Sequence, residues 1–298
     1  MGASRLILSF WPGMSTVWNG LEPQETTRTR AKDMPIVTTD AGPLYYEESG
    51  AGPPLVFLPG LGGDVRAFSV IARHLSMKYR VFVFDPRDAG RSVVVTSPYT
   101  TADMALDVLQ ALERLAVGSV HLVGHSLGGL IAQEAALQRP DMIASLVLAC
   151  SHAGADDWRK AVIQAWISMR RRFSPAEFSA MTLPLLVARS FYKNHAQIEG
   201  LIRFAERNEW PQDAEAFVRQ AKAASAHDLR EQLDRIQSPT LVVAGAEDLV
   251  NPLSVATELS TLLPSSSLVV IDKAGHMPHI ERGPEFREVV STFLSQFL

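Results

Sequence analysis

The sequence predicts an α/β protein whose mostly parallel central sheet is flanked by helices. Short apolar segments alternate with longer segments of helical period from Pro35 onward, and most of the apolar segments show no polar face. Such alternation is typical of βαβ units, and strands without a polar face are typical of a parallel sheet covered on both sides. The alternation stops once, between Ser151 and Gln237, where a helical cap is expected to be inserted between two strands.

Each element is predicted from its own segment. Seven apolar or β-branched segments are expected to form strands, at 44–48, 54–58, 80–84, 119–123, 144–149, 240–244 and 267–271. The last five of these are apolar almost throughout, so we expect them to be buried on both faces. Helices are expected between the strands, over roughly 65–76, 101–116, 127–138, 252–262 and 284–297. The third helix ends at Arg139, because the residue before a proline avoids the helical region.

These elements divide the chain into three parts. Residues 34–150 and 238–298 are expected to form the α/β core, and residues 151–237 the helical cap, which is rich in aromatic side chains. Residues 1–33 are expected to be an extension without regular order, absent if translation begins at Met34. A signal peptide is the less favoured interpretation, because a Trp-Pro-Gly sequence interrupts the apolar run too early.

Composition argues against several classes of function. The net charge of −4 leaves no basic surface of the kind that nucleic-acid binding needs. Cys150 is the only cysteine, which excludes an intramolecular disulfide and argues against a thiolate metal cluster. No segment approaches the roughly 20 apolar residues that span a bilayer. We therefore expect a soluble, cytoplasmic monomer or homodimer that binds neither nucleic acid nor membranes.

Signatures of cofactor and metal binding are also missing. Gly60-x-Gly62 begins like a dinucleotide-binding loop, but Val65 stands where its last glycine is required. The sequence shows no phosphate-binding lysine motif, no zinc spacing of histidines and no calcium loop. We therefore expect no cofactor and no metal ion.

A serine between two glycines marks the junction of the strand at 119–123 and the helix at 127–138. The segment Gly124-His125-Ser126-Leu127-Gly128 has the form G-x-S-x-G, which is a modest signal by itself. Between a strand and a helix, this motif places a nucleophilic serine on a strained, exposed turn. The glycines are needed because the neighbouring backbone leaves no room for a Cβ atom.

Further motifs occur in a fixed order around this turn: PGLGGD, FDPRDAGRS, GHSLGG, GAEDLVNP and AGHMPHIERGPEF. With these motifs, the sequence from about Met34 to the C-terminus resembles the α/β-hydrolase superfamily. It is most similar to the cofactor-free serine esterase and lactonase branch, which includes carboxylesterases like 3-oxoadipate enol-lactonase. The resemblance implies the α/β-hydrolase fold and a nucleophile, an acid and a histidine in that order along the chain.

That order implies Asp248 as the acid and His276 as the base, each just after a predicted strand. Glu247 is the rival acid, and Asp248 could instead be a helix N-cap or turn residue. His276 directly follows a glycine, as in the family's G-H pattern. His279 is expected to pack or to line the mouth of the site. His125 is too close in sequence to reach the serine, so we expect a packed or lining histidine.

Two backbone N–H groups are expected to form the oxyanion hole. The N–H of Leu127 follows the nucleophile at the start of a helix, and the second donor is expected at Leu61, in the loop after the strand at 54–58. The sequence has Pro59-Gly60 where the family commonly has His-Gly. Because the donor is a backbone group, the oxyanion hole is expected to survive this change.

The segment FDPRDAGRS resembles the family's D-x-R-G-x-G-x-S turn, with Asp88 where glycine is usual. Asp85 and Arg87 are charged residues at the end of a buried strand. Burial of charge is costly unless the charge is paired, so we expect these two side chains to pair and to fix the loop.

The sequence thus predicts a serine hydrolase that cleaves a carboxylic ester or lactone through an acyl-enzyme intermediate. Ser126, rather than aspartate, at the turn argues against haloalkane dehalogenase and epoxide hydrolase chemistry. The aromatic cap suggests a hydrophobic substrate, and Arg170, Arg189 and Arg203 are candidates to meet a substrate carboxylate. Two alternatives stay open: a ligand-binding receptor that turns over slowly or not at all, and a perhydrolase or lyase that uses the same three residues.

Overall fold

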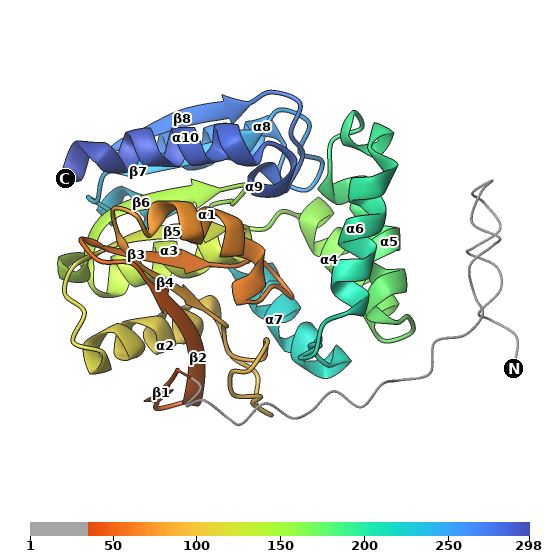
Figure 1. Cartoon of the computed structure of the whole chain (residues 1–298), viewed down its shortest axis with the longest axis horizontal. Helices are drawn as coiled ribbons and strands as arrows, with labels where there is room; N and C mark the ends of the chain where they lie inside the picture. Colours follow the sequence, from red (N-terminus) through yellow and green to blue (C-terminus); the bar gives the residue numbers. More distant parts are fainter. Residues whose placement is uncertain (1–34) are drawn as a thin grey trace, which may run out of the picture. The chain divides into compact units, whose positions relative to one another are not determined.

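An eight-stranded sheet lies at the centre of the computed structural model, which describes residues 35–298 (Figure 1). The strands are β1 Ile36–Thr39, β2 Gly42–Ser49, β3 Pro54–Leu58, β4 Arg80–Phe84, β5 Val120–His125, β6 Ile143–Ala149, β7 Thr240–Gly245 and β8 Ser266–Ile271. Their order across the sheet is β1-β2-β4-β3-β5-β6-β7-β8. β2 pairs antiparallel with β1 and β4, and every other pairing is parallel. The predicted fold class is therefore confirmed, and the predicted extension at 1–33 lies outside the described residues.

Helices cover both faces of this sheet. They are α1 Ser69–Leu75, α2 Thr101–Arg114, α3 Leu127–Gln138, α4 Asp157–Arg170, α5 Pro175–Leu186, α6 His195–Glu206, α7 Ala214–Ala226, α8 Leu253–Leu262, α9 Pro278–Glu281 and α10 Gly283–Leu294. Alternate side chains of β3 enter different cores: Val56 and Leu58 pack with α2 and α3, whereas Leu55 and Phe57 pack with α1 and α10. Burial on both faces explains why β3 carries no polar side chain. No helix within residues 35–298 is long and apolar enough to cross a bilayer.

Two strands differ from the expectation. β1 was not predicted, since its four residues alternate between exposed and buried and form a short antiparallel edge. The segment 267–271 was expected to be buried on both faces, but Val270 of β8 is 41% exposed. β8 forms the other edge of the sheet, where neighbouring elements cover a strand less completely.

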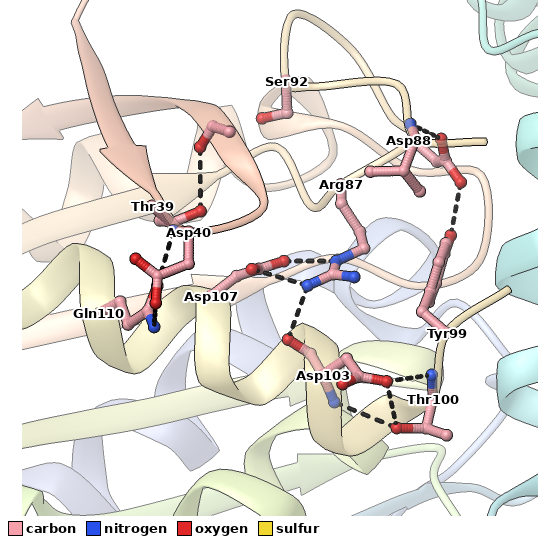
Figure 2. A network of polar contacts seen from close by, with 12 residues as sticks. Thr39, Asp40, Arg87, Asp88, Ser92, Tyr99, Thr100, Asp103, Asp107 and Gln110 are labelled. Carbon is pink, nitrogen blue, oxygen red and sulfur yellow. Dashed lines mark hydrogen bonds and ion pairs between the residues drawn. The ribbon is translucent and has the colours of Figure 1, made fainter. Parts of the chain in front are cut away.

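The expected pairing of Asp85 with Arg87 is wrong. Arg87 forms a bidentate ion pair with Asp107 of α2, with N–O distances of 2.5 and 2.7 Å (Figure 2). The Asp85 carboxylate instead accepts hydrogen bonds from the backbone N–H groups of Val65 (2.7 Å) and Arg91 (2.8 Å). Both buried charges are therefore satisfied, as their burial requires, but by partners that are distant or belong to the backbone.

The helices α4 to α7, here called the cap helices, lie between β6 and β7 in the chain, within the interval where the sequence predicts a cap. They stand at the side of the sheet toward which the arrows of β6 and β8 point (Figure 1). Asp88, fully buried and at a φ of 66°, ties one of them to the core. It forms two 2.8 Å contacts with the guanidinium of Arg219 in α7 and accepts a 2.8 Å hydrogen bond from the Tyr99 hydroxyl.

Candidate active site

Ser126 occupies a strained turn between β5 and α3. Its φ of 51° and ψ of −116° lie outside the regions that residues with a side chain prefer. A Cβ atom on Gly124 would overlap the carbonyl oxygen of Gly128, and one on Gly128 would overlap the carbonyl of Leu58. The two glycines therefore let α3 pack directly against the strands, so the turn is sharp and the serine stands at its tip.

The structure brings the three predicted residues into one hydrogen-bonded chain. The Oγ of Ser126 lies 3.0 Å from Nε2 of His276, and Nδ1 of His276 lies 2.8 Å from Oδ2 of Asp248. The side chains of His276 and Asp248 are buried, with 4% and 0% exposure. A carboxylate facing Nδ1 keeps the proton on that nitrogen and leaves the lone pair of Nε2 directed at the serine hydroxyl.

The two adjacent acids in the loop after β7 have different partners. Oδ1 of Asp248 accepts hydrogen bonds from the N–H groups of Val250 (2.8 Å) and Asn251 (2.9 Å), while its other oxygen faces the histidine. Asp248 is thus a turn residue and a partner of His276 at the same time. Glu247, the rival acid, instead accepts a 3.1 Å hydrogen bond from the backbone N–H of Arg189.

The other two histidines of the site are packed, as the sequence predicts. Burial lowers the pKa of His125 to about 3, so its ring is neutral, and Nε2 contacts the backbone oxygen of His276 at 2.7 Å. The ring of His279 lies 4.6 Å from that of His125 and 5.2 Å from that of Phe68, and burial lowers its pKa as well. The ring of His125 therefore packs directly against the loop of His276, and the ring of His279 packs against His125.

Glu281 of α9 holds the loop that carries His276, a role that the sequence did not predict. Its carboxylate accepts hydrogen bonds from the backbone N–H groups of Gly275 (2.9 Å), Met277 (3.1 Å) and Ala188 (2.6 Å). Gly275 and Met277 flank His276, so the carboxylate fixes the backbone on both sides of the imidazole. The sequence carries no signal for this role, because every partner is a backbone group.

The two predicted oxyanion donors lie at the edge of the same site. Leu127 is the first residue of α3, where backbone N–H groups have no partner within the helix. The loop that contains Leu61 passes against the serine, since a Cβ atom on Gly60 would lie 3.3 Å from Cβ of Ser126. Neither N–H donates to another group within residues 35–298. Both are thus free to bind a developing negative charge, and their role stays a prediction.

Ser126 and His276 border a cavity of about 950 Å³. Its lining comes from the loop after β3, from α1, from all four cap helices and from the loop after β8. Most of the lining is apolar, including Trp166, Phe178, Leu183, Leu186, Phe191, Leu201, Phe204, Phe217 and Ile280. A smaller recess of about 40 Å³ also borders Ser126, and Leu61, Ser126 and Trp166 line both spaces. Pockets near 1,000 Å³ accommodate ligands of drug size.

A serine on a strained turn after a central parallel strand, with an acid and a histidine following later strands, defines the class as an α/β-hydrolase. The chain belongs to the α/β hydrolase fold family, whose sequence model matches residues 53–283. The resemblance to the α/β-hydrolase superfamily inferred from the motifs is confirmed. The protein is accordingly an enzyme of the α/β-hydrolase family.

One relative and two solved structures are 24–29% identical to this chain. The chain is 29% identical over 257 residues to "Putative carbamate hydrolase RutD" of Pseudomonas syringae pv. syringae, covering 82% of this chain and 94% of that relative. An esterase from Thermogutta terrifontis has a TM-score of 0.77 at 26% identity, with 88% and 97% of the two chains covered. The enol-lactonase from Burkholderia xenovorans LB400 shares the fold, with a TM-score of 0.80 at 24% identity over 88% and 100% of the chains.

Proposed function

We propose that the protein is a serine hydrolase that cleaves a carboxylic ester or lactone, with Ser126, His276 and Asp248 as its catalytic residues. One observation carries the proposal: the three side chains form a hydrogen-bonded chain whose serine opens on a large, mostly apolar cavity. A serine hydroxyl is a weak nucleophile at neutral pH and becomes effective with a base that a third group orients.

Acylation uses all three residues. The Oγ of Ser126 attacks the substrate carbonyl carbon while its proton passes to Nε2 of His276. The carbonyl oxygen becomes an anion, which the N–H groups of Leu61 and Leu127 stabilise; losing one such donor typically costs about 2.7 to 4 kcal/mol. The protonated imidazole then gives its proton to the leaving oxygen as the carbon–oxygen bond breaks. An alcohol leaves from an ester, whereas in a lactone it stays attached to the acyl group.

Deacylation repeats these steps with water as the nucleophile. Nε2 of His276 takes a proton from the water as its oxygen bonds to the acyl carbon, and the proton returns to Oγ of Ser126 when the acyl–enzyme bond breaks. Asp248 holds the imidazole in its orientation throughout, through the 2.8 Å contact with Nδ1. The products are a carboxylic acid and an alcohol.

Carbamates are a second candidate class, because the relatives from Pseudomonas syringae and Variovorax paradoxus, both 29% identical to this chain, are each named "Putative carbamate hydrolase RutD". The carbonyl of a carbamate is open to attack by the same serine. The size and apolar lining of the cavity favour an ester or lactone with a larger hydrophobic part.

A covalent probe and a substrate panel test the proposal together. A fluorophosphonate should label Ser126, located by mass spectrometry, and p-nitrophenyl esters should be hydrolysed with a burst of p-nitrophenol. We expect Ser126→Ala to lose labelling and to lower kcat by at least about 10⁴-fold while keeping its circular dichroism spectrum. Ligand binding without turnover or labelling would favour a receptor instead, and turnover of carbamates but not esters would favour the second class.

A further inference from the structure

The charged side chains that line the large cavity are unequally paired. Besides histidines, four ionisable residues line it: Asp64, Arg66, Arg170 and Glu281. Arg66 forms a bidentate ion pair with Asp64, with N–O distances of 2.8 and 2.7 Å. Glu281 is satisfied by three backbone N–H groups. Arg170 forms no ion pair with any carboxylate in the described part of the chain.

Arg170 is held at the cavity wall by a neutral partner. One of its terminal nitrogens donates to the backbone oxygen of Gln212, which leaves the guanidinium with several further N–H groups. The side chain is half-buried, and desolvation lowers its pKa against the opposing effect of the Asp213 charge, although arginine stays protonated at neutral pH. Phe178 and Phe217, whose rings lie 5.3 Å apart, line the same cavity. A cation in such apolar surroundings is stabilised by an anion that reaches it.

The spacing of Trp166 and Arg170 on helix α4 indicates where Arg170 lies along the cavity. Trp166 and Arg170 are four residues apart, so they lie on one face of the helix and about 6 Å apart along its axis. Trp166 also lines the recess at Ser126, whereas Arg170 lines only the large cavity. Trp166 thus lines the part of the cavity at the serine, and Arg170 lines the large cavity about one helical turn farther along α4.

We propose that Arg170 is a specificity-determining residue that binds a carboxylate of the substrate. The substrate class is then an ester or lactone with an apolar body and a free carboxylate remote from the scissile carbonyl. The planar guanidinium fork matches a carboxylate, and such charge-assisted hydrogen bonds are about twice as strong as neutral ones. This inference rests on the proposed function and narrows its substrate class.

Binding to the Ser126→Ala protein tests the inference without turnover. Monomethyl suberate and dimethyl suberate have the same apolar chain, but only the first carries a carboxylate at pH 7.5. By isothermal titration calorimetry, we expect the monoester to bind roughly 10- to 100-fold more tightly than the diester. Equal affinities for the two compounds would overturn the inference.

Two further substitutions in the Ser126→Ala background separate recognition from structure. Arg170→Gln keeps a donor for the Gln212 oxygen but loses the charge, so the preference for the monoester should fall to near unity. Arg203→Gln is the matched control, because Arg203 is exposed, pairs with Glu199 and does not line the cavity; it should keep the full preference. If Arg170→Gln weakens both ligands equally, the residue acts only on structure and the inference fails.

The inference and the proposed function fail separately. Missing fluorophosphonate labelling at Ser126 would contradict the proposed function, whatever the binding data show. Labelling and ester turnover together with equal binding of the two suberate esters would contradict the role of Arg170 alone.

Discussion

At the residue scale, Glu247 and Asp248 are adjacent in the sequence, but only Asp248 contacts the imidazole of His276. Asp248→Asn should lower kcat by roughly 10⁴-fold, because an amide cannot stabilise the protonated imidazole or enforce its tautomer. Glu247→Gln should keep kcat within about threefold, since within residues 35–298 the hydrogen bond of that side chain is to the backbone N–H of Arg189 and not to His276. Hydrolysis of p-nitrophenyl butanoate measures both. A larger loss for Glu247→Gln than for Asp248→Asn would exchange their roles.

Asp85 predicts a dependence of stability on pH that does not involve the active site. Burial raises the pKa of this carboxyl from 3.8 to about 6, although the N–H groups of Arg91 and Val65 oppose the change. The pKa of Asp85 is higher in the folded protein than in the unfolded chain, so the protonated carboxyl stabilises the fold. This contribution is fully present below about pH 3.8 and is lost as pH rises through about 6.

The substitution Asp85→Asn isolates this effect. Between pH 4 and pH 7.5, the unfolding free energy of the wild type, relative to that of Asp85→Asn, should fall by about 2 to 3 kcal/mol. Urea unfolding at the two pH values gives the difference, and any constant offset from altered hydrogen bonds cancels. A difference that does not change with pH would show that the carboxyl titrates alike in both states.

Residues could be predicted from the sequence where the fold itself decides their position. Ser126, Asp248 and His276 each follow a parallel strand, and the carboxyl ends of such strands meet at one edge of the sheet. The partner of Arg87 could not be predicted, because Asp107 reaches it from α2 across the loop (Figure 2). Glu281 could not be predicted either, since backbone partners leave no pattern in the sequence.

At the element scale, hydrophobic period predicted the buried strands well and the peripheral elements poorly. The predicted bounds of β3 and β4 are those of the structure, because both strands are apolar on both faces. The short edge strand β1 and the single-turn helix α9 lack enough residues to show a period. The cap helices were expected only as a group, since their apolar residues serve both packing and the cavity wall.

The link between Asp88 and Arg219 should hold α7 to the core. Arg219→Met leaves the fully buried Asp88 without its cation, so we expect the unfolding free energy to fall by about 3 to 5 kcal/mol in urea titrations. Adding Asp88→Gly removes the unpaired charge and places glycine at a φ of 66°, which should restore more than half of the loss. A double variant as unstable as Arg219→Met would show that the loss does not arise from the unpaired carboxylate of Asp88.

At the scale of the whole molecule, the core and the cap helices both line the cavity, so both should limit the size of the substrate. Each methylene group buried against apolar surface contributes about 0.8 kcal/mol. For p-nitrophenyl esters from acetate to decanoate, kcat/KM should therefore rise by up to about fourfold per methylene until the chain fills its part of the cavity. Initial rates across the series measure this, and a flat profile would place the acyl chain outside the cavity.

A substitution at Gly200, in the cap helix α6, should reduce the acyl-chain length that the enzyme prefers. Gly200 lines the cavity and has open space where a Cβ atom would stand. Gly200→Leu should extend a side chain into this space and move the optimum to shorter acyl chains, without loss of stability, because leucine favours a helix more than glycine does. Gly200→Ala is the matched control and should keep the wild-type optimum, since its methyl group is too short to reach the acyl chain. An unchanged optimum in Gly200→Leu would mean that the acyl group does not extend along α6, and that the cavity near this helix holds another part of the substrate.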